Sequence, residues 1–315
     1  MTLTAPEPSP SPRSALRRAT KRAYLMCPPT YFDVVYAIND WMDPAVRVDT
    51  ELAMHQWLDL VRTYRSLGHD VSIVEPVAGL PDMVFVTDSG LVVDGVAVGA
   101  RYRSPHRAAE AGHVLNWLRA NGHPEAAAPE FVNEGEGDFL VVGSTILAGT
   151  GFRSDPRAHA EVGARLGREV LTLNLIDPTY YHLNTALGVL DDATIAYLPK
   201  AFAPDSLTLL RERFPNAVIA DEADTAWLGL NLVSDGYHVV LAAQATGLAD
   251  QIRDIGFQPV PVDFAEFRKS GGGIKCATME LRGSAAGGSR GSAGWNCDDC
   301  GPRCDGHGTG SRRSP

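Results

Sequence analysis

Short apolar runs alternate along the chain with longer segments in which apolar residues recur at helical spacing. The pattern is clearest from residue 139, where two apolar runs flank a Gly143-Ser144 turn and a helix is predicted over 156–166. The first copy of the pattern opens with a strand predicted over 83–86. Strand, turn, strand, helix and strand recur four times up to residue 262, at a period of roughly 45–55 residues. A fixed period of this size indicates a repeat architecture.

The two ends of this region supply the pieces of a fifth unit. The predicted pieces are strands over 24–27, 71–74 and 276–281 and a helix over 50–67. Pairing both ends within one unit would hide the edges of its sheet. We therefore predict an α/β fold of five ββαβ modules with pseudo-fivefold symmetry.

The composition is that of an ordinary globular protein and narrows the choice of partners. The 315 residues are 44% hydrophobic, enough to bury a core of normal size. A formal net charge of −10 gives no electrostatic support for nucleic-acid binding. No apolar run is long enough to predict a transmembrane helix, so a membrane is not an expected partner either. Oligomeric state cannot be read from these features, and a homodimer stays open.

Both ends of the chain differ in composition from its middle. Residues 1–21 are rich in Pro, Ser and basic residues and lack the apolar stretch of a secretory signal. Residues 283–315 are rich in Gly, Ser and Arg. We predict a disordered leader and a disordered tail around a single domain over 22–282. That domain holds only Cys27 and Cys276 of the five cysteines, which favours a reducing cytoplasm over a disulfide framework.

The predicted tail carries four residues of types that bind zinc: Cys297, Cys300, Cys304 and His307. Their spacing is tight, and no predicted element surrounds them. A non-native C-terminus explains them better than a metal site does.

Polar residues that can do chemistry gather in the loops between the modules. Equivalent loops in a ring of modules converge at one end of its axis, so residues far apart in sequence can meet there. The glycines at 271–273 lead into Cys276, and glycine lets a backbone approach a ligand closely. These residue types fit nucleophilic catalysis. A cysteine thiolate attacks an electrophilic carbon, a histidine transfers the proton, and a carboxylate orients the histidine. The structural alternatives are a buried inert thiol at Cys276, a core histidine at His182 and a solvated acidic loop at Glu134.

Four motifs in these loops resemble those of the guanidino-group-modifying (amidinotransferase) superfamily. Its members include dimethylarginine dimethylaminohydrolase, arginine deiminase and the arginine dihydrolases. The motifs are Pro81-Asp82-Met83-Val84-Phe85, Glu134-Gly135-x-Gly137-Asp138, Tyr181-His182-Leu183-x-Thr185 and Gly271-Gly272-Gly273-x-Lys275-Cys276-x-Thr278-x-Glu280-Leu281. Each is weak alone, but together they follow the family's order, and the likeness covers about residues 22–282. The resemblance implies a five-bladed α/β propeller, in agreement with the repeat.

Matched by position, the resemblance implies that Cys276 is the nucleophile and His182 the general acid/base. Glu134 would hold His182 and contact the guanidinium of the substrate. The implied reaction is hydrolysis of a guanidino C–N bond through a covalent thiouronium on the cysteine. It requires neither a metal nor an organic cofactor.

The other matched residues fall around the implied substrate: Asp88, Asp82, Arg107, Arg153, Asn39 and Asn184. Asp88 would pair with the guanidinium nitrogens, and Arg107 and Arg153 would bind the α-carboxylate through bidentate contacts. Asp82 would lie near the α-amino group, and Asn39 matches a substrate-contacting asparagine of the dihydrolase branch. The structural alternatives are turn residues at Asp82 and Asp88 and a helix-surface arginine at Arg107.

One departure from the family pattern bears on the substrate. Many relatives have Asp two residues after the catalytic histidine, where this chain has Asn184, and Asp88 stands where the dihydrolases often have Asn. The loss of one carboxylate favours a methylated guanidinium, whereas Asn39 favours arginine itself. We expect a dimethylargininase-like hydrolase that acts on methylated arginine and yields citrulline and an amine. The alternatives are an arginine deiminase or dihydrolase, an amidinotransferase and a catalytically silent binding homologue.

Overall fold

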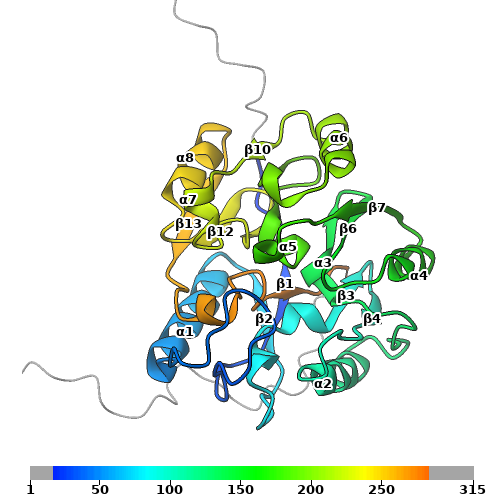
Figure 1. Ribbon diagram of the computed structural model, residues 1–315, viewed down its shortest axis with the longest axis vertical. Coiled ribbons are helices and arrows are strands. Elements are labelled where there is room, and N and C mark those ends of the chain that lie inside the picture. Colours follow the sequence, from blue (N-terminus) through cyan, green and yellow to red (C-terminus); the bar gives the residue numbers. More distant parts are fainter. Residues whose placement is uncertain (1–16, 284–315) are drawn as a thin grey trace, which may run out of the picture.

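The computed structural model describes residues 17–283, and within them the strands form five small sheets (Figure 1). The first sheet joins β14 (Met279–Glu280), β1 (Ala23–Met26) and β2 (Asp70–Ile73), and the second joins β3 (Gly90–Val93) and β4 (Val96–Gly99). The third joins β5 (Phe139–Val142), β6 (Thr145–Thr150) and β7 (Glu169–Asn174). The fourth joins β8 (Leu187–Val189), β9 (Ile195–Tyr197) and β10 (Val218–Ile219), and the fifth joins β11 (Val233–Ser234), β12 (His238–Ala242) and β13 (Gln258–Val262). The four cysteine and histidine residues of the predicted tail lie outside the described residues.

The longer helices lie toward the outside of the molecule in Figure 1, and in four of the five sheets one of them connects two strands. The longer ones are α1 (Thr50–Ser66), α2 (Ala108–Ala120), α4 (Pro156–Leu166), α6 (Pro204–Arg213) and α8 (Thr246–Asp254). Short helical turns are α3 (Gly135–Asp138), α5 (Leu183–Ala186), α7 (Glu222–Thr225), η1 (Pro81–Val84), η2 (Val86–Ser89), η3 (Pro178–Tyr180), η4 (Pro199–Ala201) and η5 (Phe267–Ser270). None of the helices in residues 17–283 is long and apolar enough to cross a membrane.

Four of the five sheets repeat the predicted connection, whereas the second consists of β3 and β4 and lacks the predicted strand after its helix. In the third sheet β5 and β6 pair antiparallel, and β7 returns through α4 to pair parallel with β6. The fourth and fifth sheets follow the same order. The prediction of a mixed α/β fold of small repeated units is confirmed, and the described strands form separate sheets with no single closed ladder.

The helix predicted over 156–166 has those bounds because its ends are strongly marked. The side chain of Asp155 caps the first turn by accepting from Arg157 N, and Pro156 takes the first helical position, where no backbone N–H is needed. Gly167 ends the helix with φ 61°, a left-handed conformation that glycine adopts without strain.

The two ends of the domain meet in the first sheet, as predicted. β14 pairs antiparallel with β1, with Tyr24 opposite Glu280. Leu281 N also donates to Ala23 O at 2.8 Å. The predicted strand over 276–281 is shorter in the structure, so Cys276 lies in a turn three residues before β14.

The strand predicted over 83–86 is wrong. This segment forms the 3-10 turns η1 and η2, and its N–H groups bond locally, as when Phe85 N donates to Asp82 O. A short apolar run indicates burial but does not distinguish a strand from a buried turn. The residues are buried as expected, and the first strand of this unit is β3.

Candidate active site

The loops that carry the predicted chemistry come together between the short helices. Glu134 immediately precedes α3, and His182 immediately precedes α5. The two helices pack against each other and lie near the middle of the view in Figure 1. η2, which carries Asp88, packs against α3 and also binds the cysteine turn, where Thr87 N donates to Cys276 O at 3.2 Å.

His182 is fully buried between two carboxylates. Its Nε2 lies 2.7 Å from Glu134 Oε2, and its Nδ1 lies 3.7 Å from Asp88 Oδ1. Burial disfavours the charged imidazole, but Asp88 and the hydrogen bond to Glu134 raise the pKa of His182 above its ordinary value. Nδ1 and Asp88 Oδ1 are both buried without a hydrogen-bond partner. Such atoms are rare in folded proteins and here face each other, as the lining of a ligand site would.

Gly137 allows this close approach. A Cβ at position 137 would lie 2.5 Å from Asp88 Oδ1 and 3.2 Å from the Nδ1 and Cε1 atoms of His182. Real side chains do not tolerate the first of these distances. The Glu134-Gly135-x-Gly137 motif therefore has a steric reason for its second glycine.

Glu134 is a buried carboxylate with three partners. Besides His182, it accepts from Arg153 Nη1 at 2.9 Å and from Arg103 N at 3.0 Å. Burial opposes its charge, but the hydrogen bond to His182 and the guanidinium of Arg153 hold the pKa of Glu134 well below its ordinary value. Arg153 also donates to Ile38 O and stacks over the ring of Tyr181. Glu134 therefore stays ionised and fixes both the histidine and the arginine.

Arg107 is placed against Asp88. Its Nη1 donates to Asp88 Oδ2 at 2.6 Å, and the same guanidinium binds Glu110 and Tyr102. Arg107 is only 3% exposed, which excludes the alternative of a helix-surface arginine. Burial raises the pKa of Glu110 to about 7, although Arg107 opposes that rise. The structure thus joins Arg107 to the site, with its charge directed at the carboxylates around it.

Asp82 and Asn39 meet at Ser270, just before the glycine run. Asp82 accepts from Ser270 Oγ at 2.8 Å and from Tyr36 OH at 2.7 Å. Asn39 Nδ2 donates to Ser270 O at 3.1 Å. The loop that carries Tyr36 and Asn39 is therefore fastened to the segment that leads into Cys276.

The Cys276 thiol is 2% exposed and lies among neutral amides. Its Sγ is 3.7 Å from Asn184 Oδ1 and 3.2 Å from Asn231 Nδ2. Burial, with a further contribution from the charge of Asp88, raises the pKa of Cys276 to about 12. The thiol is therefore protonated at neutral pH unless a cation is brought beside it.

Sequence reasoning missed three residues of this site: Asn231, Ser270 and Glu110. Asn231 opens the fourth predicted copy, at a strand-entry position like that of Asn184 in the third, so the repeat held a signal for it. Glu110 stands three residues after Arg107, a spacing that pairs charges on one helix face. Ser270 gave no signal, because its role depends on two distant loops.

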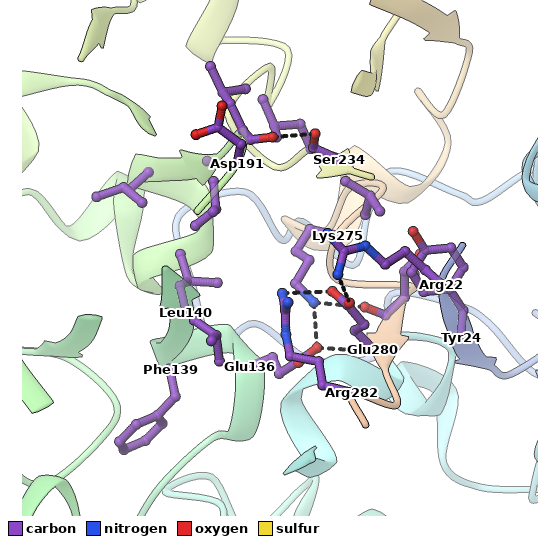
Figure 2. Close-up of a pocket in the computed structure, with 18 of the residues that line it drawn as sticks. Arg22, Tyr24, Glu136, Phe139, Leu140, Asp191, Ser234, Lys275, Glu280 and Arg282 are labelled. Carbon is purple, nitrogen blue, oxygen red and sulfur yellow. Dashed lines mark hydrogen bonds and ion pairs between the residues drawn. The ribbon is translucent and has the colours of Figure 1, made fainter. Parts of the chain in front are cut away.

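Neighbours of the site residues line a separate pocket, shown in Figure 2. Lys275, next to Cys276, forms an ion pair there with Glu136, two residues after Glu134. Glu136 also accepts from Glu280 N at 2.9 Å. This pair therefore joins the cysteine turn, α3 and the closing strand β14.

No family model matches this chain. A dimethylarginine dimethylaminohydrolase of Mycobacterium tuberculosis is 48% identical over 267 residues, which cover 85% of this chain and 88% of that protein. The chain belongs to the guanidino-group-modifying superfamily. Another member, the bifunctional arginine dihydrolase/ornithine cyclodeaminase ArgZ of Synechocystis, is 33% identical over 82% of this chain but only 37% of its own length.

Solved structures of the superfamily have the same fold. The N-terminal domain of ArgZ, covalently bound to a reaction intermediate, matches with a TM-score of 0.80 at 32% identity and covers 83% of this chain and 98% of that domain. A dimethylarginine dimethylaminohydrolase adduct matches with a TM-score of 0.68 at 20% identity, a likeness that concerns the fold alone.

Proposed function

We propose that this chain hydrolyses the guanidino group of methylated arginine to citrulline and an amine, through a covalent intermediate on Cys276. It is a hydrolase of the dimethylargininase type, and the alternatives of deiminase, amidinotransferase and silent homologue are not favoured. The observation that carries the proposal is the pair of partnerless buried atoms, Asp88 Oδ1 and His182 Nδ1, 3.7 Å apart near the buried thiol. A guanidinium N–H would satisfy the carboxylate oxygen, and the departing nitrogen would face the imidazole.

The first half of the reaction transfers the amidino group to sulfur. The Cys276 thiolate attacks the guanidinium carbon and forms a C–S bond. His182, whose Nε2 is held by Glu134, donates the proton on Nδ1 to the departing amine as the C–N bond breaks. The product of this half is an S-alkylthiouronium on Cys276 and a free amine.

The second half returns the enzyme to its starting state. His182 takes a proton from a water molecule, and the water oxygen attacks the thiouronium carbon. The C–S bond breaks, the hydroxyl proton passes to the solvent as the C=O bond of citrulline forms, and the Cys276 thiolate is protonated again once citrulline leaves. One water is consumed for each amine released, and no redox partner is needed.

The substrate itself supplies part of the activation. The pKa of Cys276 is raised to about 12 by burial and by Asp88, so few thiols are ionised near neutral pH. A guanidinium bound beside the sulfur would favour the thiolate, as opposite charges lower the pKa of an acid. Thiol ionisation is therefore coupled to substrate binding.

The rest of the substrate is assigned to the loop residues. Arg153 and Arg107 are proposed to bind the α-carboxylate, with Asp82 and Asn39 at the α-amino end. In this structure the two arginines pair with Glu134 and Asp88, the carboxylates assigned to the substrate guanidinium. Substrate binding must therefore exchange the partners in these ion pairs. The two arginines would pair with the substrate α-carboxylate, and Glu134 and Asp88 would pair with the substrate guanidinium.

Methylated arginine is preferred as the substrate because Asn184 is neutral. Its side-chain oxygen lies 3.7 Å from Cys276 Sγ, where a carboxylate would bind a further guanidinium N–H. A methylated guanidinium has fewer N–H groups to satisfy, so its binding is weakened less by the lack of a carboxylate at position 184. The 48% identical relative named as a dimethylarginine dimethylaminohydrolase supports this choice.

We also propose that the five sheets are the blades of a five-bladed propeller. Neighbouring units contact each other in chain order, as β14 does β3, β5 does β8, and β8 does β11. The contact of α1 with β13 brings the fifth sheet beside the first. A single domain over 22–282, a cytoplasmic location and a homodimer remain predictions.

A citrulline assay with arginine, monomethylarginine and asymmetric dimethylarginine tests the function. We expect the highest kcat/KM with a methylated substrate and no turnover by a Cys276→Ala variant. Mass spectrometry of acid-quenched reactions should find the amidino adduct on the peptide that contains Cys276. Citrulline formation by Cys276→Ala at the wild-type rate would refute the mechanism, and a preference for arginine would refute the substrate.

A further inference from the structure

We infer that Asn231 is a further catalytic residue, whose side-chain amide holds the Cys276 thiol and stabilises it as a thiolate. The inference deepens the proposed function and rests on Cys276 being the nucleophile. Asn231 is completely buried, and its Nδ2 lies 3.2 Å from Cys276 Sγ. Among the described residues, it is the side chain with an N–H donor hydrogen-bonded to this sulfur.

The orientation of the amide is fixed by its other partners. Asn231 Oδ1 accepts from Cys276 N at 3.0 Å, and Nδ2 donates to Asn184 O at 3.0 Å. A flipped amide would point an N–H at Cys276 N and a carbonyl at Asn184 O, which loses both bonds. The N–H therefore faces the sulfur.

The backbone of Asn231 completes the grip on the cysteine turn. Its carbonyl accepts from Lys275 N at 3.1 Å. A Cβ on Gly273 would lie 2.7 Å from Asn231 Oδ1, so the glycine run lets the turn close over this side chain. Asn231 thus binds the sulfur and the backbone N–H of Cys276 and the backbone N–H of Lys275. It also binds the backbone carbonyl of Asn184.

The chemical consequence concerns both halves of the reaction. An N–H donor stabilises the thiolate more than the thiol, because hydrogen bonds to charged acceptors are the stronger ones. It therefore favours ionisation before attack and favours sulfur as the leaving group when citrulline is released. For comparison, removal of one preorganised donor to a developing oxyanion in other enzymes lowers kcat by roughly 10² to 10³.

Two variants and one control test the inference without relying on turnover alone. Asn231→Ala removes the amide, and Asn231→Asp keeps its shape but replaces the donor with an acceptor. Leu232→Ala is the control, since Leu232 is buried beside Asn231 and packs in a different hydrophobic cluster from Cys276. Thermal unfolding of all three separates loss of stability from loss of the donor.

The readout is the rate at which iodoacetamide alkylates Cys276 between pH 7 and 9. Trypsin places this thiol in the peptide 276–282, apart from Cys27 and the tail cysteines, so mass spectrometry follows it alone. Each unit by which the thiol pKa rises lowers the thiolate fraction tenfold. The thiolate of higher pKa is also more nucleophilic, which offsets part of that loss in rate. We expect alkylation to slow about threefold or more in both Asn231 variants and to stay unchanged in Leu232→Ala.

Turnover adds a pH signature that a purely structural role would not produce. The carboxyl group introduced by Asn231→Asp carries an O–H donor when it is protonated, so kcat of this variant relative to wild type should rise as the pH falls. Wild-type alkylation rates and kcat within threefold in both Asn231 variants would overturn the inference. If the wild type releases no citrulline but alkylation slows as expected, the proposed function fails and the role of Asn231 stands.

Discussion

Alanine at position 137 would test how closely Asp88 and His182 must approach. The new Cβ would lie 2.5 Å from Asp88 Oδ1. Carbon and oxygen atoms ordinarily stay at least about 3.3 Å apart, so the carboxylate must retreat by roughly 0.8 Å or α3 must shift. A misplacement of about 1 Å in a catalytic group can lower a rate by roughly 10². We expect kcat for dimethylarginine to fall by about that factor in Gly137→Ala.

The same substitution should also destabilise the fold. Overpacking a buried site costs about 1–3 kcal/mol. In a domain of this size each kcal/mol lowers the melting temperature by roughly 2–4 °C. Differential scanning calorimetry measures this effect, and a citrulline assay under the same buffer conditions measures kcat.

Gly112→Ala is the matched control, because it makes the same change in open space. Gly112 lies in the exposed part of α2, and a Cβ there would meet no atom within 4 Å. Alanine in place of a helix-interior glycine should stabilise the protein by about 0.5–1 kcal/mol and leave kcat unchanged. If Gly137→Ala keeps the wild-type kcat and melting temperature while the control behaves as expected, the close approach of Asp88 to His182 is not needed for turnover.

Three further predictions concern charge. Glu134→Gln should lower kcat by roughly 10² and move the pH–rate profile to lower pH, because Glu134 is one of the groups that raise the pKa of His182; an unshifted profile would contradict this. Asn184→Asp adds a carboxylate near Cys276, so the ratio of kcat/KM for arginine to that for dimethylarginine should rise in a competition assay, and a lower ratio would count against the substrate assignment. Asp235, between β11 and β12, has its pKa held at about 2: burial opposes this, but hydrogen bonds from two histidine rings and backbone N–H groups outweigh it. A lowered carboxyl pKa stabilises the fold above the unfolded value of 3.8 and ceases to do so as the pH falls through 2. Asp235→Asn should therefore be about 2 kcal/mol less stable in urea at pH 7 and match the wild type near pH 2, whereas an equal loss at both pH values would refute the linkage.

The fold could be predicted where local signals and tertiary packing agree. α4 follows from Asp155, Pro156 and Gly167, which mark its ends by local chemistry. The segment 83–86 could not be predicted in this way, because its burial comes from distant partners while its backbone bonds to itself. The pairing of β1 with β14 was predicted only because the repeat left an incomplete unit at each end.

In the candidate site, too, features marked by local sequence could be predicted and those that depend on distant partners could not. Residues inside ordered motifs, such as Cys276, His182 and Glu134, could be proposed from the sequence. The contacts that fix them could not, because Asn231 and Ser270 act through backbone groups of loops far away in the chain. Arg107 shows the limit most clearly: its position was expected near the substrate, but its bond to Asp88 depends on how η2 folds.

The pairing of β1 with β14 also sets the order in which the enzyme becomes active. Leu25 and Met279 are partners roughly 250 residues apart, and closing a loop of that length costs about 5 kcal/mol of chain entropy plus a constant. Cys276 lies just before β14, so a chain that releases this strand should lose the proposed nucleophile while its other sheets stay folded. Low concentrations of denaturant should therefore abolish activity before the protein unfolds globally. During synthesis β1 is made first, but it cannot pair with β14 until β14, the last strand, has been made. The Cys276 thiol therefore reaches its position only at the end of folding.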